Sequence, residues 1–275
     1  MMNSIVKVKD FNLEQTLECG QCFRFKKYSD NHYIVNAKDK ALEVKQEDDN
    51  LIFYNISKEE EKNWIEYFDL DRDYSEIKDY IISREPKMKE IIEAGSGIRI
   101  LNQDFFETLI SFIISQNKQI PQIKQVINNL AIKYGEELSD DNYAFPTMER
   151  LSQVTEEEFR ESKAGFRAKY LVDACEKVKS GLINEKDLLT LSNEEILNEL
   201  CTIKGVGVKV SNCVMLFGLG RKEAFPIDVW IKRIMEEIYF KKETKLDIIQ
   251  KFAEEKFGSY GGFAQQYLFY YSRIK

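Results

Sequence analysis

The spacing of apolar side chains changes at residue 57, and this change constrains the fold more than any other feature of the chain. From Cys22 to about Ile56, apolar and polar residues alternate, with Asp30-Asn31 and Asp48-Asp49-Asn50 as turns between the alternating runs. Such alternation is typical of an antiparallel sheet with one buried face. Ser57-Lys58-Glu59-Glu60 then forms a capping box, and helical spacing continues to the end of the chain.

The predicted fold class is therefore α+β. We expect a small N-terminal antiparallel sheet domain with flanking helices over residues 1–100, followed by a large all-helical region over residues 101–275. Within that region, Asp104 precedes a helix from Phe105 to about Gln116 that is apolar nearly all round and so buried. Pro121 suits the first turn of another helix, and Ser192 opens a second capping box.

Composition argues against several classes of protein. The chain of 275 residues has no apolar run long enough to span a membrane and no signal-like N-terminus, so we expect an intracellular, cytoplasmic protein, associated with the nucleoid if it is bacterial. The five cysteines are odd in number and scattered, which argues against a disulfide framework or a zinc site. His32 is the single histidine, so Ser–His or Cys–His catalysis is not expected.

The charge is unevenly distributed. The net charge is −7, which at first argues against a nucleic-acid partner. Residues 201–275 nevertheless contain 13 basic and 8 acidic residues, a net charge of +5, whereas the rest of the chain carries −12. An acidic protein can present one basic face, and the local field matters more than the total.

A glycine-rich turn lies in the C-terminal third. A helix from the Ser192 cap to about Cys201 is followed by Lys204-Gly205-Val206-Gly207, and a second helix begins near Val208. The pattern predicts a helix-hairpin-helix at about residues 193–218, in which unpaired amides at the start of the second helix bind a DNA phosphate. An ordinary helix–helix turn with a glycine cap remains the alternative. Carbonyl groups of the turn could also hold a monovalent cation that bridges to phosphate; the candidate ligands are Cys201, Ile203 and Val206.

Three residues around this hairpin could carry chemistry. Lys209 lies one step into the second helix, Cys213 follows four residues later on the same face, and Asp228 has the position of an N-cap for a helix from Val229 to about Tyr239. Taken singly, each has a structural explanation as a solvated lysine, a core cysteine or a simple cap. Taken together after the Gly-Val-Gly turn, they resemble the helix-hairpin-helix glycosylase superfamily.

Four further segments resemble the 8-oxoguanine DNA glycosylases. Gly20-Gln21-Cys22-Phe23-Arg24 is similar to the family's G-Q-x-F-R, and Ser115-Gln116-Asn117 to the segment that fills the space left by a flipped base. Residues 165–170, with the sequence GFRAKY, are similar to G-Y-R-A-R-Y, and residues 262–269 to the base-pocket segment. The resemblance spans most of the chain.

The resemblance implies a pocket for the damaged base. The carbonyl of Gly20 would accept the N7 hydrogen that 8-oxoguanine has and guanine lacks. Gln265 would bond the edge of the base and Phe269 would stack on its face, with Cys213 and Phe217 in the same pocket. Extrusion of the base into such a pocket is required because chemistry cannot reach it inside a duplex.

The resemblance also implies a set of DNA contacts. Asn117 would fill the gap in the duplex, Phe166 would wedge into it, and Arg167 would contact the orphaned cytosine. The hairpin contacts would come from Gly205, Gly207 and Val210. Three positions depart from the animal members of the family: Trp230 replaces a histidine, Lys118 replaces an asparagine, and Gln122 replaces an arginine that reads the opposite cytosine.

The function implied is that of a bifunctional DNA glycosylase. Lys209 would attack C1′ of the damaged nucleotide and Asp228 would stabilise positive charge on the sugar, after which the strand breaks by β-elimination. The expected partner is double-stranded DNA containing 8-oxoguanine, the protein is expected to be a monomer, and no cofactor is required.

Competing functions have weaker support. A thymine-glycol-type endonuclease usually carries four clustered cysteines after this region, and no cysteine follows Cys213. Adenine-mismatch and alkyl-base glycosylases usually lack the lysine. A non-catalytic DNA-binding scaffold is the alternative from a different class.

Overall fold

The alternating segment forms most of a five-stranded antiparallel sheet. The computed structural model describes residues 2–139 and 141–275. The strands lie in the order β1-β5-β4-β3-β2, with the bounds β1 (Met2–Lys7), β2 (Phe25–Ser29), β3 (His32–Ala37), β4 (Lys40–Glu47) and β5 (Asn50–Ile56). Alternate side chains of the three central strands are buried: Tyr33, Val35, Leu42, Val44, Leu51 and Phe53. The predicted apolar face is therefore confirmed.

Three strands were not indicated by the sequence. Strand β1 pairs with β5, so that Ile5 lies opposite Ile52, yet Ile5 is 66% exposed. As an edge strand with mostly exposed side chains, β1 has no buried face to impose an alternating pattern. The short hairpin of β6 (Glu137–Ser139) and β7 (Asn142–Tyr143) was also not predicted, because strands of two or three residues are too short to show an alternating pattern of apolar and polar side chains.

The remainder is helical, as the sequence predicts. The helices are α1 (Leu13–Glu18), α2 (Lys58–Tyr67), α3 (Tyr74–Arg84), α4 (Met88–Ala94), α5 (Phe105–Ser115), α6 (Ile120–Tyr134), α7 (Met148–Leu151), α8 (Glu156–Glu161), α9 (Ala168–Lys179), α10 (Glu185–Leu188), α11 (Asn193–Cys201), α12 (Val208–Gly218), α13 (Val229–Met235), α14 (Leu246–Phe257) and α15 (Gly261–Ile274), with the short 3-10 helices η1 (Gly165–Arg167) and η3 (Gly258–Tyr260) and the π-helix η2 (Glu236–Phe240). Four predicted N-caps are confirmed, since each side chain accepts a backbone amide: Ser57, Asp104, Ser192 and Asp228.

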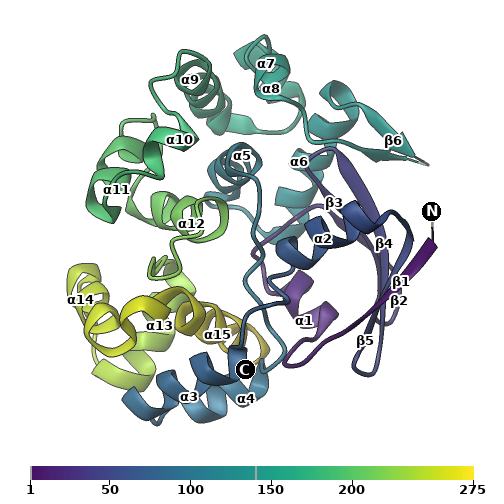
Figure 1. The fold of residues 1–275 in the computed structure, drawn as a ribbon. Helices are drawn as coiled ribbons and strands as arrows, with labels where there is room; N and C mark the ends of the chain where they lie inside the picture. The colour runs from purple at the N-terminus through teal and green to yellow at the C-terminus, as the bar shows by residue number, and fades with distance from the viewer. Residues whose placement is uncertain (1, 140) are drawn as a thin grey trace.

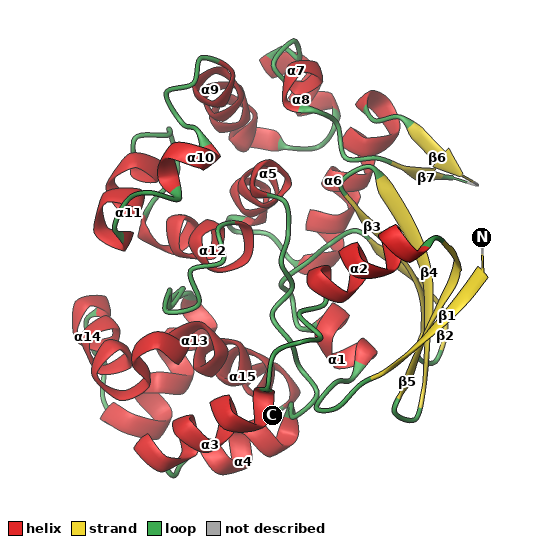
Figure 2. Cartoon of the chain, viewed as in Figure 1, coloured by secondary structure: helices red, strands yellow, loops and turns green. Residues whose placement is uncertain are grey.

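The sheet lies on one side of the molecule and the helices occupy the rest (Figure 2). Helices α3 and α4, although early in the chain, pack beside α14 and α15 (Figure 1). Helix α5 is buried on nearly every side and packs against α12. No helix in the described part of the chain is long and apolar enough to cross a membrane.

Two apolar clusters form the interior. One joins the sheet, α1 and α2 and includes Phe53, Phe68 and Leu101, whereas the other joins the remaining helices and includes buried residues of α3 and α4 such as Ile81. We retain the division near residue 100 as a proposal about folding units. The buried ion pair between Arg24 of the segment before β2 and Glu107 of α5, with Nη1 and Oε2 3.2 Å apart, links the two clusters.

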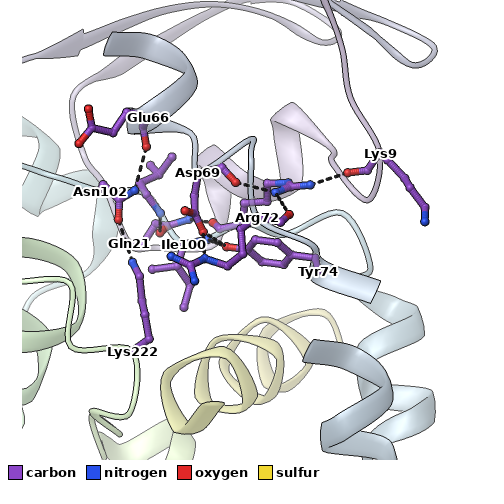
Figure 3. Close-up of polar contacts among 11 residues, drawn as sticks. Lys9, Gln21, Glu66, Asp69, Arg72, Tyr74, Ile100, Asn102 and Lys222 are labelled. Atoms are coloured by element: carbon purple, nitrogen blue, oxygen red, sulfur yellow. Dashed lines mark hydrogen bonds and ion pairs between the residues drawn. The ribbon is translucent and has the colours of Figure 1, made fainter. Parts of the chain in front are cut away.

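Arg99 ties the segment before α5 to three other parts of the chain. Its buried guanidinium donates to the carbonyls of Lys9, Asp69 and Arg72 at 2.5–2.9 Å and lies 4.3 Å from the ring centroid of Tyr74. The Tyr74 hydroxyl donates to the Asp69 carboxylate, as Figure 3 shows. Because each of these backbone carbonyls would otherwise lose a partner, the network holds the segment in one position.

Lys222 extends toward this network from the segment after α12. Its ammonium donates to the side-chain oxygen of Asn102 at 3.0 Å, and Asn102 in turn donates to the carbonyl of Glu66 (Figure 3). Burial lowers the pKa of Lys222 to about 8, although the Asp69 carboxylate opposes this effect.

We predict that Lys222→Met changes how stability depends on pH. An unfolded lysine has a pKa of about 10.4, so between pH 8 and that value the unfolded chain binds a proton that the folded chain has lost. The free energy of unfolding therefore rises with pH in this window, by on the order of 2 kcal/mol from this group. Denaturant titrations at pH 7.5, 9 and 10 should show that Lys222→Met loses this rise. An unchanged pH dependence would contradict the prediction.

Candidate active site

A tight turn joins α11 to α12 and leaves backbone groups of its glycines exposed to solvent. Gly205 has φ +75°, and a Cβ there would lie 2.4 Å from the ring of Tyr170, so no other residue fits. Gly207 is the N-cap of α12 without a side-chain cap, and a Cβ there would meet nothing within 4 Å. The first amides of α12 therefore lack intrahelical acceptors and face an open surface, which suits an anion. The side chain of Val210 is buried, so its contact with DNA would come from its backbone amide.

An acidic residue holds the turn. The backbone amide of Lys204 donates to Asp173 at 2.8 Å, and the ammonium groups of Lys177 and Lys204 lie 3.5 and 3.3 Å from the Asp173 carboxylate. Burial alone would raise the pKa of Asp173, but the Lys204 hydrogen bonds and the two positive charges outweigh it and lower the pKa. The turn is thus anchored from α9.

Lys209 lies at the start of α12 beside an aromatic wall. Its Nζ is 5.2 Å from the ring centroid of Phe112 on α5, and Phe112 stacks on Phe217 of α12 with 5.4 Å between ring centroids. Cys213 follows one turn later and is 3% exposed. Burial raises the pKa of Cys213, and the nearby positive charge of Lys209 opposes the rise without cancelling it. Cys213 is therefore a neutral thiol at neutral pH.

Asp228 caps α13 and keeps one carboxylate oxygen free. Its Oδ1 accepts the backbone amides of Trp230 and Ile231, both at 2.9 Å. Among the described residues nothing bonds to Oδ2. The carboxylate is thereby fixed in direction by the helix that it starts, as the sequence predicts.

The loop between α1 and β2 places Gly20 in the same region as Lys209 and Asp228. Gly20 has φ +83°, and a Cβ there would lie 3.0 Å from Cε1 of Phe269. The side chain of Gln21 holds the loop by donating to the carbonyls of Thr16 and Arg99 and accepting the amide of Leu101, at 2.7–2.9 Å. The residue after Gln265, Gln266, donates from Nε2 to the carbonyl of Cys19 at 3.0 Å.

These segments enclose one cleft of about 380 Å³. Lys209, Asp228, Gly20 and Phe269, predicted from four separate segments, all line it. Its volume falls in the range of small-molecule sites. The structure therefore brings together the predicted nucleophile, the predicted carboxylate and two of the predicted base contacts.

Three other predicted pocket residues do not line the cleft but are buried: Cys213, Phe217 and Gln265. Phe217 is 4% exposed and backs Phe112, which itself lines the cleft. Gln265 is 5% exposed, one turn before Phe269 on α15, and its Oε1 has no hydrogen-bond partner among the described residues. A buried amide oxygen without a donor costs free energy, so Gln265 is suited to receive a donor from a ligand.

The predicted duplex contacts gather on the loop after α5 and on η1. Phe166 is 48% exposed, and Asn117 is exposed with φ +51°. Arg167, in contrast, is 4% exposed and donates from Nε to the carbonyl of Gln116 at 2.7 Å and from Nη2 to that of Asn117 at 3.2 Å. In this state Arg167 shapes the loop that presents Asn117, so contact with a cytosine would require it to exchange these bonds. Gln122 is exposed on the first turn of α6, where its Oε1 accepts the Gln119 amide at 3.4 Å.

Several cleft residues were missed by the sequence reasoning. Phe112 belongs to a helix whose sequence indicates only burial, Ser115 was noted only as the first residue of the Ser115-Gln116-Asn117 segment, and Ile120 and Arg273 belong to no recognised motif. Helical spacing could have found one of them, because Arg273 lies four residues after Phe269 and hence on the same face of α15. The described residues contain no cluster of three or more His, Cys, Asp or Glu side chains that could hold a metal ion.

Comparison with known proteins agrees with this geometry. Residues 4–109 match the 8-oxoguanine DNA glycosylase N-terminal domain, and residues 110–258 match the HhH-GPD superfamily of base excision DNA repair proteins. An Arabidopsis thaliana protein named N-glycosylase/DNA lyase OGG1 is 29% identical, over 94% of this chain and 77% of the relative.

Two solved structures resemble the whole chain. MBOgg1 in complex with a low-affinity DNA ligand is 48% identical with a TM-score of 0.96, covering 100% of this chain and 96% of that one. The 8-oxoguanine glycosylase/lyase of Clostridium acetobutylicum, in complex with double-stranded DNA containing cytosine opposite 8-oxoguanine, is 44% identical with a TM-score of 0.93, covering 100% and 98%. The chain therefore belongs to the HhH-GPD superfamily of base excision DNA repair proteins and, within it, to the 8-oxoguanine DNA glycosylases.

Proposed function

We propose that this protein excises 8-oxoguanine from duplex DNA and then cleaves the strand at the resulting site. The observation that carries the proposal is the single cleft lined by Lys209, Asp228, Gly20 and Phe269. The names of the relatives, N-glycosylase/DNA lyase and 8-oxoguanine glycosylase/lyase, support the same chemistry.

The damaged base would be read inside the cleft. The Gly20 carbonyl accepts the N7 hydrogen, and Phe269 stacks on the face of the ring. The unpartnered Oε1 of Gln265 accepts a hydrogen bond from the edge of the base, which relieves the cost of its burial. The base exposes these groups to the protein only after it has left the base stack of the duplex.

Base excision would proceed by covalent catalysis. The deprotonated amine of Lys209 forms a bond to C1′ while the C1′–N9 bond breaks, and the base leaves with the bonding electrons and then takes up a proton. Positive charge develops on the sugar in the transition state, and the Asp228 carboxylate stabilises it from a fixed position. Sugar-ring opening converts the adduct to an imine, and β-elimination then breaks the C3′–O bond to phosphate.

The duplex would be held at two places. The amides at the start of α12, beside the open Gly207, bind a phosphate, while Asn117 and Phe166 occupy the gap left by the extruded nucleotide. One chain supplies every group in this scheme, so we propose that the protein acts as a monomer. Because its proposed substrate is duplex DNA, we propose that it acts in the cytoplasm, associated with the nucleoid if the host is bacterial.

No cofactor takes part in the proposed chemistry. The carbonyls of Cys201, Ile203 and Val206 remain candidate ligands for a monovalent cation that would bridge the turn to a phosphate. The Ile203 carbonyl already accepts the Val206 amide at 3.0 Å, and the Lys177 ammonium donates to the adjacent Thr202 carbonyl. This positive charge weakens the fit of the turn to a cation.

Lys209→Gln should abolish base release while binding to the duplex is largely retained. The amide cannot form an imine, so borohydride should trap the wild type on an 8-oxoguanine duplex but not this variant. Lys118→Gln is a matched control, because Lys118 lines the same cleft and should not be the nucleophile. Normal trapping of Lys209→Gln, or no trapping of the wild type, would contradict the proposed function.

Asp228→Asn should lower the single-turnover rate of excision by roughly 100-fold or more, since it removes a charge aimed at the transition state. Asparagine is as good an N-cap as aspartate, so the thermal unfolding midpoint should stay close to that of the wild type. Asp228→Ala should lose about 1 kcal/mol of stability as well. Full activity of Asp228→Asn would make Asp228 a structural cap alone.

Gln122→Arg should sharpen the preference for cytosine opposite the lesion. A neutral amide is a weaker donor to cytosine than a guanidinium, and by rotating it can also accept, so the wild type should discriminate less strictly. One lost contact in DNA recognition costs about 1–3 kcal/mol, which relaxes selectivity by roughly tenfold or more. The measurement is single-turnover excision from duplexes with each of the four bases opposite 8-oxoguanine. A strict preference that Gln122→Arg leaves unchanged would assign the reading to other residues.

A further inference from the structure

The side chain of Arg273 lines the cleft, and its positive charge has no acidic partner among the described residues. It lines the cleft with Lys209 and Asp228, and its Cζ lies 5.6 Å from the ring centroid of Phe269, one turn earlier on α15. Its side chain is exposed, so its conformation is not dictated by the packing of the core.

The guanidinium of Arg273 forms no ion pair in the described part of the chain, and its hydrogen bond to the carbonyl of Glu18 is long, at 3.4 Å. Two acidic side chains that line another cavity together with Arg273 have other partners: Glu18 accepts the hydroxyl of Tyr33 at 2.9 Å, and Glu14 pairs with Lys27 at 2.7 Å. A guanidinium presents several N–H donors in a fixed plane, so Arg273 retains donors for a ligand.

Gly20 brings an acceptor beside these donors. The Nη1 atom of Arg273 lies 3.4 Å from the point that a Cβ of Gly20 would occupy. Because Gly20 has a positive φ and no side chain, its backbone can lie this close to the guanidinium and to Phe269, whose Cε1 lies 3.0 Å from the same point. The Gly20 backbone and the Arg273 guanidinium are therefore an acceptor and a donor that lie close together in the cleft lining.

8-Oxoguanine carries the complementary pair on its five-membered ring. Its N7 bears a hydrogen, and the neighbouring C8 bears a carbonyl oxygen, whereas guanine has a bare N7 and a C–H at C8. We propose that Arg273 is a specificity-determining residue that donates a hydrogen bond to the C8 carbonyl of the damaged base, next to the Gly20 carbonyl. The proposal rests on the proposed function and adds a direct reader for the oxygen that defines the lesion.

The test separates a contact to the base from a contact to the DNA backbone. In a Lys209→Gln background, which prevents turnover, equilibrium binding is measured to three duplexes that differ at one position: 8-oxoguanine, guanine, or a tetrahydrofuran abasic analogue. Arg273→Ala should weaken binding to the 8-oxoguanine duplex by roughly tenfold, because a hydrogen bond to a charged group is lost. Binding to the other two duplexes should stay nearly unchanged, since neither has a C8 carbonyl.

Matched variants guard against a nonspecific effect of charge. Lys275→Ala removes another positive charge from the end of α15, where Lys275 pairs with Glu237, and should leave all three affinities unchanged. Arg273→Lys should restore only part of the preference for 8-oxoguanine, because an ammonium lacks the planar set of donors. Unfolding midpoints check that each variant is folded.

Two results would overturn the inference. An equal loss on all three duplexes would make Arg273 a phosphate contact, and an unchanged preference for 8-oxoguanine in Arg273→Ala would remove it from recognition. If the Lys209→Gln parent itself bound 8-oxoguanine and guanine duplexes equally, and the wild type were not trapped by borohydride, the proposed function would fail instead.

Discussion

The packing of α12 on α5 is the contact on which the site depends. Gly218 lets the two helices approach so closely that a Cβ there would lie 3.1 Å from Cβ of Thr108 and 3.2 Å from Cα of Phe105. The rings of Phe112 and Phe217 stack across the same interface. Because both helices are almost fully buried, neither can rotate without opening a cavity in the core. The start of α12, with Lys209, is therefore held at a fixed distance from the aromatic wall.

The two ends of the chain complete the cleft around that fixed point. Gly20 comes from the loop before β2, and Phe269 and Arg273 come from the last helix. The hydrogen bond from Gln266 to the Cys19 carbonyl joins these ends across 247 positions of sequence. Gln21 reinforces the joint through the segment that Arg99 anchors. The acceptor at Gly20 is thus positioned by buried polar contacts, each of which would be costly to leave unpaired.

The titratable groups at the candidate site differ in their surroundings. Cys213 lies deep behind Lys209, where burial keeps its thiol neutral. Asp228 and Arg273 both line the cleft, one fixed by backbone amides and the other without an acidic partner among the described residues. A negative group in a fixed direction suits stabilisation of a developing positive charge, whereas an unpaired guanidinium suits recognition of an oxygen.

The sequence by itself determined the α+β class, the main helix starts and the hairpin, because alternation, capping boxes and glycines act through neighbours a few residues apart. It also indicated Lys209, Asp228, Gly20 and Phe269, since each belongs to a local motif. Only the tertiary structure decided that β1 pairs with β5, that Arg167 is buried against the Gln116 carbonyl, and that Phe112 and Arg273 line the cleft. Those facts depend on contacts between residues far apart in the chain, and such contacts produce no periodic pattern or fixed spacing in the sequence.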